Sequence, residues 1–144
     1  MNKDFGKVIN EIDMVIEWWL TMDGGYIDID ELLNQQRKLS GFTYHLAHVY
    51  REFNEQKTFA KNRFEGKSRR IKGHEIKKGE SGIKAEIFAK EQTINEMEDM
   101  NNTEMLVTNT KVLLDKAGDV LDSMRQYISY LKEEKTREFS QGNS

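Results

Sequence analysis

The sequence predicts an all-α protein made of long antiparallel helices with heptad repeats, arranged as a helical hairpin or coiled-coil bundle in a homo-oligomer. The first observation is that none of the 144 residues is proline, the strongest breaker of helices. The second is that charged residues make up 33% and apolar residues only 37%, a small apolar share for one self-sufficient core. The third is a seven-residue apolar repeat in two segments, which keeps one face of a helix turned toward a partner.

The first helix is predicted at residues 7–22. Its apolar residues follow three- and four-residue steps and therefore share one face: Ile9, Ile12, Ile16, Trp19 and Leu20. Trp19 lies on this face and is expected in a core or interface. Its neighbour Trp18 points partly elsewhere, so stacking on a nucleic-acid base stays open for it. The glycines of residues 23–25 end the helix.

A long helix is predicted at residues 28–65, beginning near Asp28 because carboxylates are favourable at a helix N-terminus. Its apolar seven-residue repeat consists of Leu32, Leu39, Leu46, Phe53 and Ala60. Four glycines then punctuate residues 66–82. Because glycine raises the entropy cost of order, this segment is predicted to be a flexible basic loop that becomes ordered on a ligand.

Residues 83–135 are predicted to form one long helix or two, with residues 101–103 as a break or a weak point. The first part carries apolar residues on one face: Ile83, Ile87, Ile94 and Met97. The second part carries four consecutive heptads, whose apolar residues are expected to build the oligomer interface: Leu106, Leu113, Val120, Met124, Tyr127 and Leu131. The same side chains would also suit an internal core, and we expect both uses. Residues 136–144 are polar and expected to fray.

The charge is distributed unevenly, although its net value is only −3. Residues 57–84 contain ten Lys or Arg against three Glu, whereas residues 1–56 contain five basic and ten acidic residues and residues 85–144 contain seven and twelve. Basic side chains neutralise phosphates and release counterions, which gives affinity for any nucleic acid. Phe59 and Phe64 lie among them and offer faces for base stacking.

The residues expected to contact a nucleic acid are Lys57, Lys61, Arg63, Lys67, Arg69, Arg70 and Lys72, with Lys77 and Lys78 in the same basic segment. The alternative interpretation is a solvated charged loop that keeps the protein soluble. We favour binding of DNA or RNA, because the positive charge is confined to one segment of an otherwise acidic chain.

Absent residues and motifs narrow the chemistry. The chain has no cysteine, which excludes disulfides, thiolate zinc sites and cysteine nucleophiles. His45, His48 and Glu52 match a metal-ligand spacing only weakly, and residues 23–30 fail the register of a calcium loop. No nucleophile elbow, Walker loop or dinucleotide fingerprint appears. We therefore expect a protein that is no enzyme and has no catalytic residue, metal or cofactor.

No apolar run is long enough to cross a bilayer, and the acidic N-terminal segment does not look like a signal peptide. The sequence therefore predicts a cytoplasmic protein without a membrane partner.

Two stretches carry a family resemblance. The first is Lys61-Asn62-Arg63-Phe64, a Lys-x-Arg-hydrophobic motif at the end of the long helix, followed by the glycine-bearing basic segment. The second is Leu113-Leu114-Asp115, then Val120-Leu121-Asp122-Ser123-Met124-Arg125, then Ile128 and Leu131-Lys132. Over roughly residues 28–139 the chain resembles the UvsY family of recombination mediator proteins of T-even-type phages. The helix with Trp18 and Trp19 has no counterpart in the resemblance.

The resemblance implies that Lys61 and Arg63 contribute to binding of single-stranded DNA. It also implies a ring-shaped homo-oligomer in the host cell cytoplasm. Such a mediator loosens the hold of single-strand binding protein and helps to load a RecA-type recombinase onto the strand. A ring repeats each weak basic site, so that modest contacts add up to tight binding.

Two other functions fit the residues. A phage structural or assembly protein, such as a coiled-coil scaffold or adaptor, would use the heptads and offer the basic segment to an acidic partner. An inhibitor of a host enzyme would mimic DNA with the acidic arms.

Overall fold

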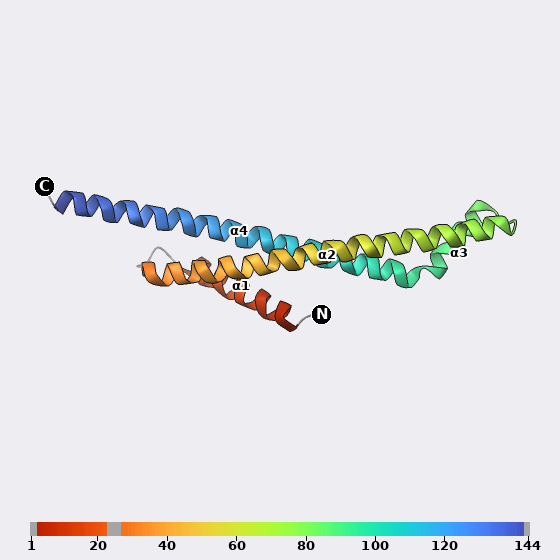
Figure 1. Cartoon of the computed structure of the whole chain (residues 1–144), viewed down its shortest axis with the longest axis horizontal. Coiled ribbons are helices and arrows are strands. Elements are labelled where there is room, and N and C mark those ends of the chain that lie inside the picture. The colour runs from red at the N-terminus through yellow and green to blue at the C-terminus, as the bar shows by residue number, and fades with distance from the viewer. Residues whose placement is uncertain (1–2, 23–26, 143–144) are drawn as a thin grey trace. The chain divides into compact units, whose positions relative to one another are not determined.

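Figure 1 shows the computed structural model of the chain, which describes residues 3–22 and 27–142. Its helices are α1 (Lys3–Thr21), α2 (Ile29–Lys77), α3 (Gly82–Gln92) and α4 (Ile94–Gly142). These two ranges contain no strand, so the predicted all-α fold class is confirmed. Within the described part of the chain, no helix combines the length and the apolar character needed to cross a membrane. The predicted turn at residues 23–25 lies outside the described residues.

The chain divides into two compact units. Unit 1 comprises Met1–Val49 and Val112–Ser144, and unit 2 comprises Tyr50–Lys111. Unit 1 therefore contains α1, the beginning of α2 and the end of α4. Unit 2 contains the rest of α2, all of α3 and the beginning of α4.

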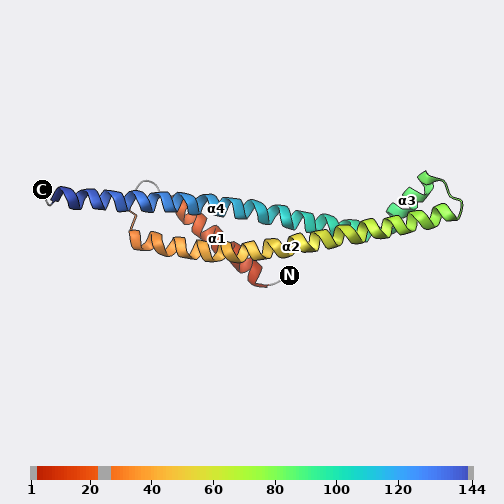
Figure 2. The same ribbon diagram turned by 45° about the horizontal axis from the view of Figure 1, so that its top comes forward.

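Unit 1 has a core shared by three helices. Figures 1 and 2 place α1 beside the first part of α2 and the middle of α4. Buried apolar side chains come from all three: Ile12, Val15 and Ile16 of α1; Leu32, Leu39 and Leu46 of α2; Ala117, Leu121, Met124 and Ile128 of α4. The seven-residue repeat at the start of α2 thus points into the core, as its period requires.

The predicted apolar face of α1 is correct only in part. Ile12 and Ile16 are buried, but Leu20 is 65% exposed. Trp18 and Trp19 are both half-buried. The indole of Trp19 meets the ring of Tyr127 edge-on, with 6.2 Å between the ring centroids. Tyr127, expected at an oligomer interface, therefore contacts α1 of its own chain.

The other predicted interface residues also take part in packing within the chain. Val120 and Met124 are buried in unit 1, and Met124 has no exposed surface. Leu113 and Leu131 in unit 1 and Leu106 in unit 2 are half-buried. These side chains therefore serve at least partly as an internal core, one of the two uses that the sequence left open.

The predicted loop at residues 66–82 is wrong over most of its length, because α2 continues to Lys77. The helix ends only where Gly79 takes a φ of 92°. The N–H of Glu80 donates to the carbonyl of Glu75 at 3.2 Å, and the N–H of Gly79 donates to the carbonyl of Ile76 at 3.0 Å. This pair of bonds is a Schellman motif, in which a glycine in the left-handed region closes the helix.

Gly66 and Gly73 lie inside α2. Each costs about 1 kcal/mol relative to alanine in a helix. Packing of the same segment offsets this cost, because Ala60 is buried and Phe64 and Ile71 are half-buried. The glycines therefore weaken the helix without ending it.

The C-terminal region forms two helices, and the break lies at Thr93 rather than at residues 101–103. α3 begins after Ser81, whose hydroxyl accepts a hydrogen bond from the N–H of Lys84 at 3.3 Å. It ends at Thr93, which is fully buried and donates its hydroxyl to the carbonyl of Ala89 at 2.7 Å. Residues 101–103 are part of α4. Residues 136–142, where the sequence predicts a frayed tail, continue α4 as a helix.

The apolar face predicted at the start of this region is also wrong. Ala85 and Ala89 are the buried residues of α3, whereas Ile83 and Ile87 are exposed. Ile94 is exposed as well, and Met97 is half-buried. The small alanine side chains allow α3 to lie close to the end of α2, and Figure 2 shows the two helices side by side after the tight turn.

Candidate nucleic-acid interface

The basic segment lies on the second part of α2, in unit 2, and is a helix instead of a loop. Each residue turns about 100° from the one before it, since a helix has 3.6 residues per turn. The direction of each basic side chain is therefore fixed by its position, and the predicted DNA-binding residues can be sorted by the side of the helix on which they lie.

Lys61 and Arg63 lie on different sides of α2. Residues two apart on a helix do not face each other, so the two exposed side chains point in nearly opposite directions. The two residues to which the resemblance gives a role in DNA binding therefore do not form one continuous contact surface. A strand that touches both must reach around the helix.

Lys67 is held by an internal ion pair. Its Nζ atom lies 2.6 Å from Oε1 of Glu96 in the first turn of α4. The side chain of Glu96 is only 13% exposed, and that of Lys67 is 40% exposed. The hydrogen bond from Lys67 lowers the pKa of the Glu96 carboxyl, with help from the backbone N–H of Glu96 and the charges of Lys67 and Arg63, while desolvation opposes them. Lys67, which the sequence predicts to contact a nucleic acid, thus forms an ion pair within unit 2.

One side of α2 carries an exposed aromatic ring followed by three cations. We call it the aromatic stripe, and it consists of Phe59, Arg63, Arg70 and Lys77, at steps of four, seven and seven residues. All four side chains are exposed, and Phe59 is 65% exposed. The stripe is about 27 Å long at 1.5 Å per residue. Phe64, the other aromatic candidate, is half-buried and less available for stacking.

Phe59 lies between two shallow grooves. One, of about 450 Å³, is formed by α2 alone and includes Arg51 and Asn62. The other, of about 490 Å³, lies between α2 and α4 and includes Arg63 with Asp99 and Thr103. A base stacked on the ring would therefore have hydrogen-bonding groups on both sides, while Asp99 would keep a phosphate away from the α4 side.

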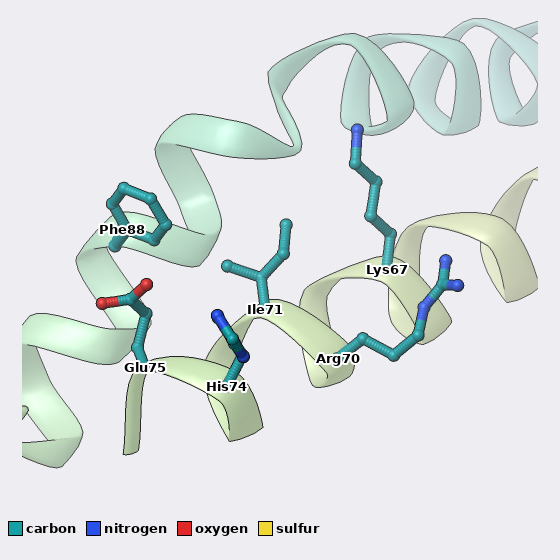
Figure 3. A pocket seen from close by; sticks show the side chains of 6 residues that line it. All are labelled: Lys67, Arg70, Ile71, His74, Glu75 and Phe88. Carbon is teal, nitrogen blue, oxygen red and sulfur yellow. The ribbon is translucent and has the colours of Figure 1, made fainter. Parts of the chain in front are cut away.

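A third shallow pocket, of about 310 Å³, lies between the end of α2 and α3. It is lined by Lys67, Arg70, Ile71, His74, Glu75 and Phe88. Figure 3 shows Ile71 pointing into the space between Phe88 of α3 and Lys67. Arg70 joins this pocket to the aromatic stripe. Sequence reasoning missed Phe88, because only the turn at residues 78–81 brings it against α2.

The remaining predicted contacts lie elsewhere on the helix. Lys61 and Lys72 are eleven residues apart and share the flank opposite the aromatic stripe, and Arg69 points away from the core. Lys57 is half-buried. Among the described residues, Lys61, Arg69 and Lys72 form no ion pair. They add positive charge but have no exposed aromatic ring among them.

The weak metal candidate gains no support. Within residues 3–22 and 27–142, no group of three or more His, Asp or Glu side chains is placed to hold a metal ion. His45 and His48 are exposed, and the ring of His48 contacts that of Tyr44 edge-on at 4.8 Å between centroids.

Comparisons of the chain with protein-family models, with curated proteins and with solved structures gave no match.

Proposed function

We propose that the chain binds single-stranded DNA along the aromatic stripe of α2 and acts as a recombination mediator. The observation that carries the binding proposal is the exposed ring of Phe59 on the same side of one helix as Arg63, Arg70 and Lys77. Proteins that hold single strands combine a cationic track for the backbone with aromatic faces for the bases. A duplex offers phosphates but no free base faces, so the ring favours a single strand.

The mediator role rests on the resemblance to the UvsY family. In this proposal, self-associated chains in the host cytoplasm gather their stripes into one longer track. The strand is taken from single-strand binding protein and presented to a RecA-type recombinase. A direct test measures the ATPase activity of such a recombinase on DNA already covered by single-strand binding protein. Addition of the chain should raise the rate, and no effect would contradict this role.

Binding itself is tested by the anisotropy of a labelled oligothymidine across a salt series. The test variant carries Arg63→Gln, Arg70→Gln and Lys77→Gln. We expect weaker binding at every salt concentration. We also expect the negative slope of log K against log salt to become shallower by about 2, because each lost phosphate contact on a single strand removes about 0.7 from its magnitude.

The matched control carries Lys132→Gln, Lys135→Gln and Arg137→Gln, three exposed basic residues near the end of α4. It has the same net charge as the test variant, so a general charge effect would weaken both alike. Equal loss in the two variants, or a parent affinity that does not respond to salt, would contradict the proposed site. Phe59→Leu should weaken binding of the single strand and leave weak duplex binding unchanged.

A second candidate function is a structural or assembly protein, such as a scaffold or adaptor. It is favoured by the exposed large apolar residues of unit 2, which a small DNA-binding module does not need: Ile76, Ile83, Ile87, Ile94 and Met105. A scaffold would assemble in the absence of DNA and ignore oligonucleotides. Mass measurement with and without an oligothymidine separates the two functions.

A further inference from the structure

The pattern of buried and exposed side chains on α3 is the reverse of the pattern expected for a helix of an isolated chain. Amphipathic helices normally turn their largest apolar side chains toward the core. Here the buried residues are Ala85 and Ala89, while Ile83 is 75% exposed and Ile87 is 53% exposed. Because the two isoleucines are four residues apart, they lie on one face of the helix, which we call the isoleucine face.

The isoleucine face does not pack on the rest of unit 2. The alanines lie about half a turn away from it around the helix, so the side of α3 that packs is the opposite one. Ile76 near the end of α2, which precedes α3, and Ile94 at the start of α4, which follows it, are also half or more exposed. Several large apolar side chains left exposed in one region are typical of an interaction site.

The charges beside the isoleucine face indicate what covers it. On one flank lie Lys84 and Glu91, and on the other lie Glu86 and Lys90. Each flank thus has one charge of each sign, so the rim has no net charge. A nucleic acid or another strongly charged partner would gain nothing from such a rim.

A second copy of α3 in antiparallel orientation matches this rim on both flanks. When two identical helices pair about a two-fold axis, equivalent flanks meet, and residues equally far on either side of the axis lie opposite each other. An axis near residues 87 and 88 brings Lys84 of one chain opposite Glu91 of the other. At this axis the two copies of Ile87 meet at the centre, whereas Ile83 lies opposite Gln92 at the end of the partner helix. The same axis brings Glu86 opposite Lys90, so all four contacts of the pair join opposite charges.

We infer that the isoleucine face of α3 is a self-association surface on which a second copy of this chain docks antiparallel. The surface is distinct from the leucine-rich seam of α4, where Val120 and Met124 are already buried within the chain. The inference rests on the proposed function for its biological role, because paired chains bring two aromatic stripes together. α3 has 11 residues and is only about 16 Å long, so the pairing is weak and depends on concentration.

The first experiment measures the mass of the full chain by sedimentation from about 1 μM to about 1 mM, a range that covers weak pairing. The test variant is Ile83→Glu with Ile87→Glu. Its control is Met105→Glu with Val112→Glu, which places the same charge on two exposed apolar residues of α4. We expect the apparent dissociation constant to rise about tenfold or more in the test variant only. A parent that stays monomeric throughout, or an unchanged mass in the test variant, overturns the inference.

The second experiment tests the antiparallel register. Lys84→Glu should weaken pairing, because it places two glutamates opposite each other, and addition of Glu91→Lys to the same chain should restore it. The chain has no cysteine, so a single Ile87→Cys also reports proximity by forming a disulfide between chains. It should crosslink faster than Met105→Cys. Failure of the charge swap to restore pairing, or equal crosslinking rates, overturns the antiparallel arrangement.

Both experiments are run without DNA, so they separate this inference from the proposed function. Self-association through α3 in a chain that ignores oligothymidine keeps the inference and overturns the binding function. If the chain binds oligothymidine but its mass is unchanged by Ile83→Glu with Ile87→Glu, the binding function is kept and the inference is overturned.

Discussion

Nζ of Lys67 on α2 and Oε1 of Glu96 on α4 are 2.6 Å apart, and this ion pair joins the two long helices of unit 2. The pair engages Lys67, one of the residues that the sequence predicts to contact a nucleic acid. It also places a carboxylate in the first turn of α4, where the positive end of the helix dipole favours negative charge. The pair therefore stabilises the segment that displays the aromatic stripe.

The ion pair predicts a specific dependence of stability on pH. The pKa of the Glu96 carboxyl is lowered from its ordinary value of 4.5, chiefly by the hydrogen bond from Lys67. A carboxyl with a lowered folded-state pKa adds stability above its unfolded pKa and loses it as the pH falls through the folded one. Glu96→Gln should therefore be less stable than the parent at neutral pH, and the difference should shrink under acid. Urea unfolding at about pH 7 and about pH 3 measures it.

Asp122→Asn is the control for this experiment. Asp122 pairs with Arg125 at 3.3 Å, but both side chains are more than half exposed. Solvent screens such a pair, so its removal should change stability little at either pH. A pH dependence as large in Asp122→Asn as in Glu96→Gln would show that the effect reflects general charge and not the pair with Lys67.

Substitution by alanine should have opposite effects on stability at the glycines inside α2 and at the glycine that follows it. Gly66 and Gly73 are helical, and an added Cβ would meet no atom within 4 Å. Gly66→Ala and Gly73→Ala should each raise the unfolding free energy by up to about 1 kcal/mol, the difference in helix propensity. Gly79→Ala should lower it by about 1 kcal/mol or more, because its φ of 92° is unfavourable for any other residue. Thermal unfolding measures all three, and no gain at Gly66 would contradict a helix there.

These glycines also show why part of the fold could not be predicted. Gly66, Gly73 and Gly79 look alike in the sequence, and each is compatible with a loop. Only Gly79 ends a helix, and what keeps the others helical is packing with residues about thirty positions away, such as Glu96. The seven-residue repeat from Leu32 to Ala60 was easier to interpret, because its period alone defines the side of the helix that becomes buried.

The candidate site was predictable in its location but not in its arrangement. Charge counting found the basic segment, since composition needs no structure. The separation of Lys61 from Arg63, and the grouping of Arg63 with Arg70 and Lys77, depend on the segment being a helix. The exposed Ile83 could not be foreseen either, because periodicity places it on a face without saying whether that face packs.

The core of unit 1 predicts that the α4 heptads matter for folding of the single chain. Met124 has no exposed surface, so Met124→Ala should lower the unfolding free energy by about 2–5 kcal/mol, the range for buried large-to-small changes. Leu131 lies one heptad further and is half-buried, so Leu131→Ala should cost less. The measurement is denaturant unfolding at low protein concentration. If the loss of unfolding free energy in Met124→Ala disappears when the protein is diluted, Met124 belongs to an interface between chains instead.

The opposite directions of Lys61 and Arg63 give the sharpest test of how a strand lies on α2. If the strand follows the aromatic stripe, Arg63→Gln should weaken oligothymidine binding more than Lys61→Gln does. Arg63 lines the groove beside Phe59, and Lys61 lies on the other flank. Each change removes one positive charge from an exposed helical side chain, so the two variants are matched controls for each other. Anisotropy at two salt concentrations should show a reduced salt dependence for Arg63→Gln alone. Equal losses would mean that the strand wraps around α2, and a larger loss at Lys61 would move the binding surface to the flank of Lys61 and Lys72.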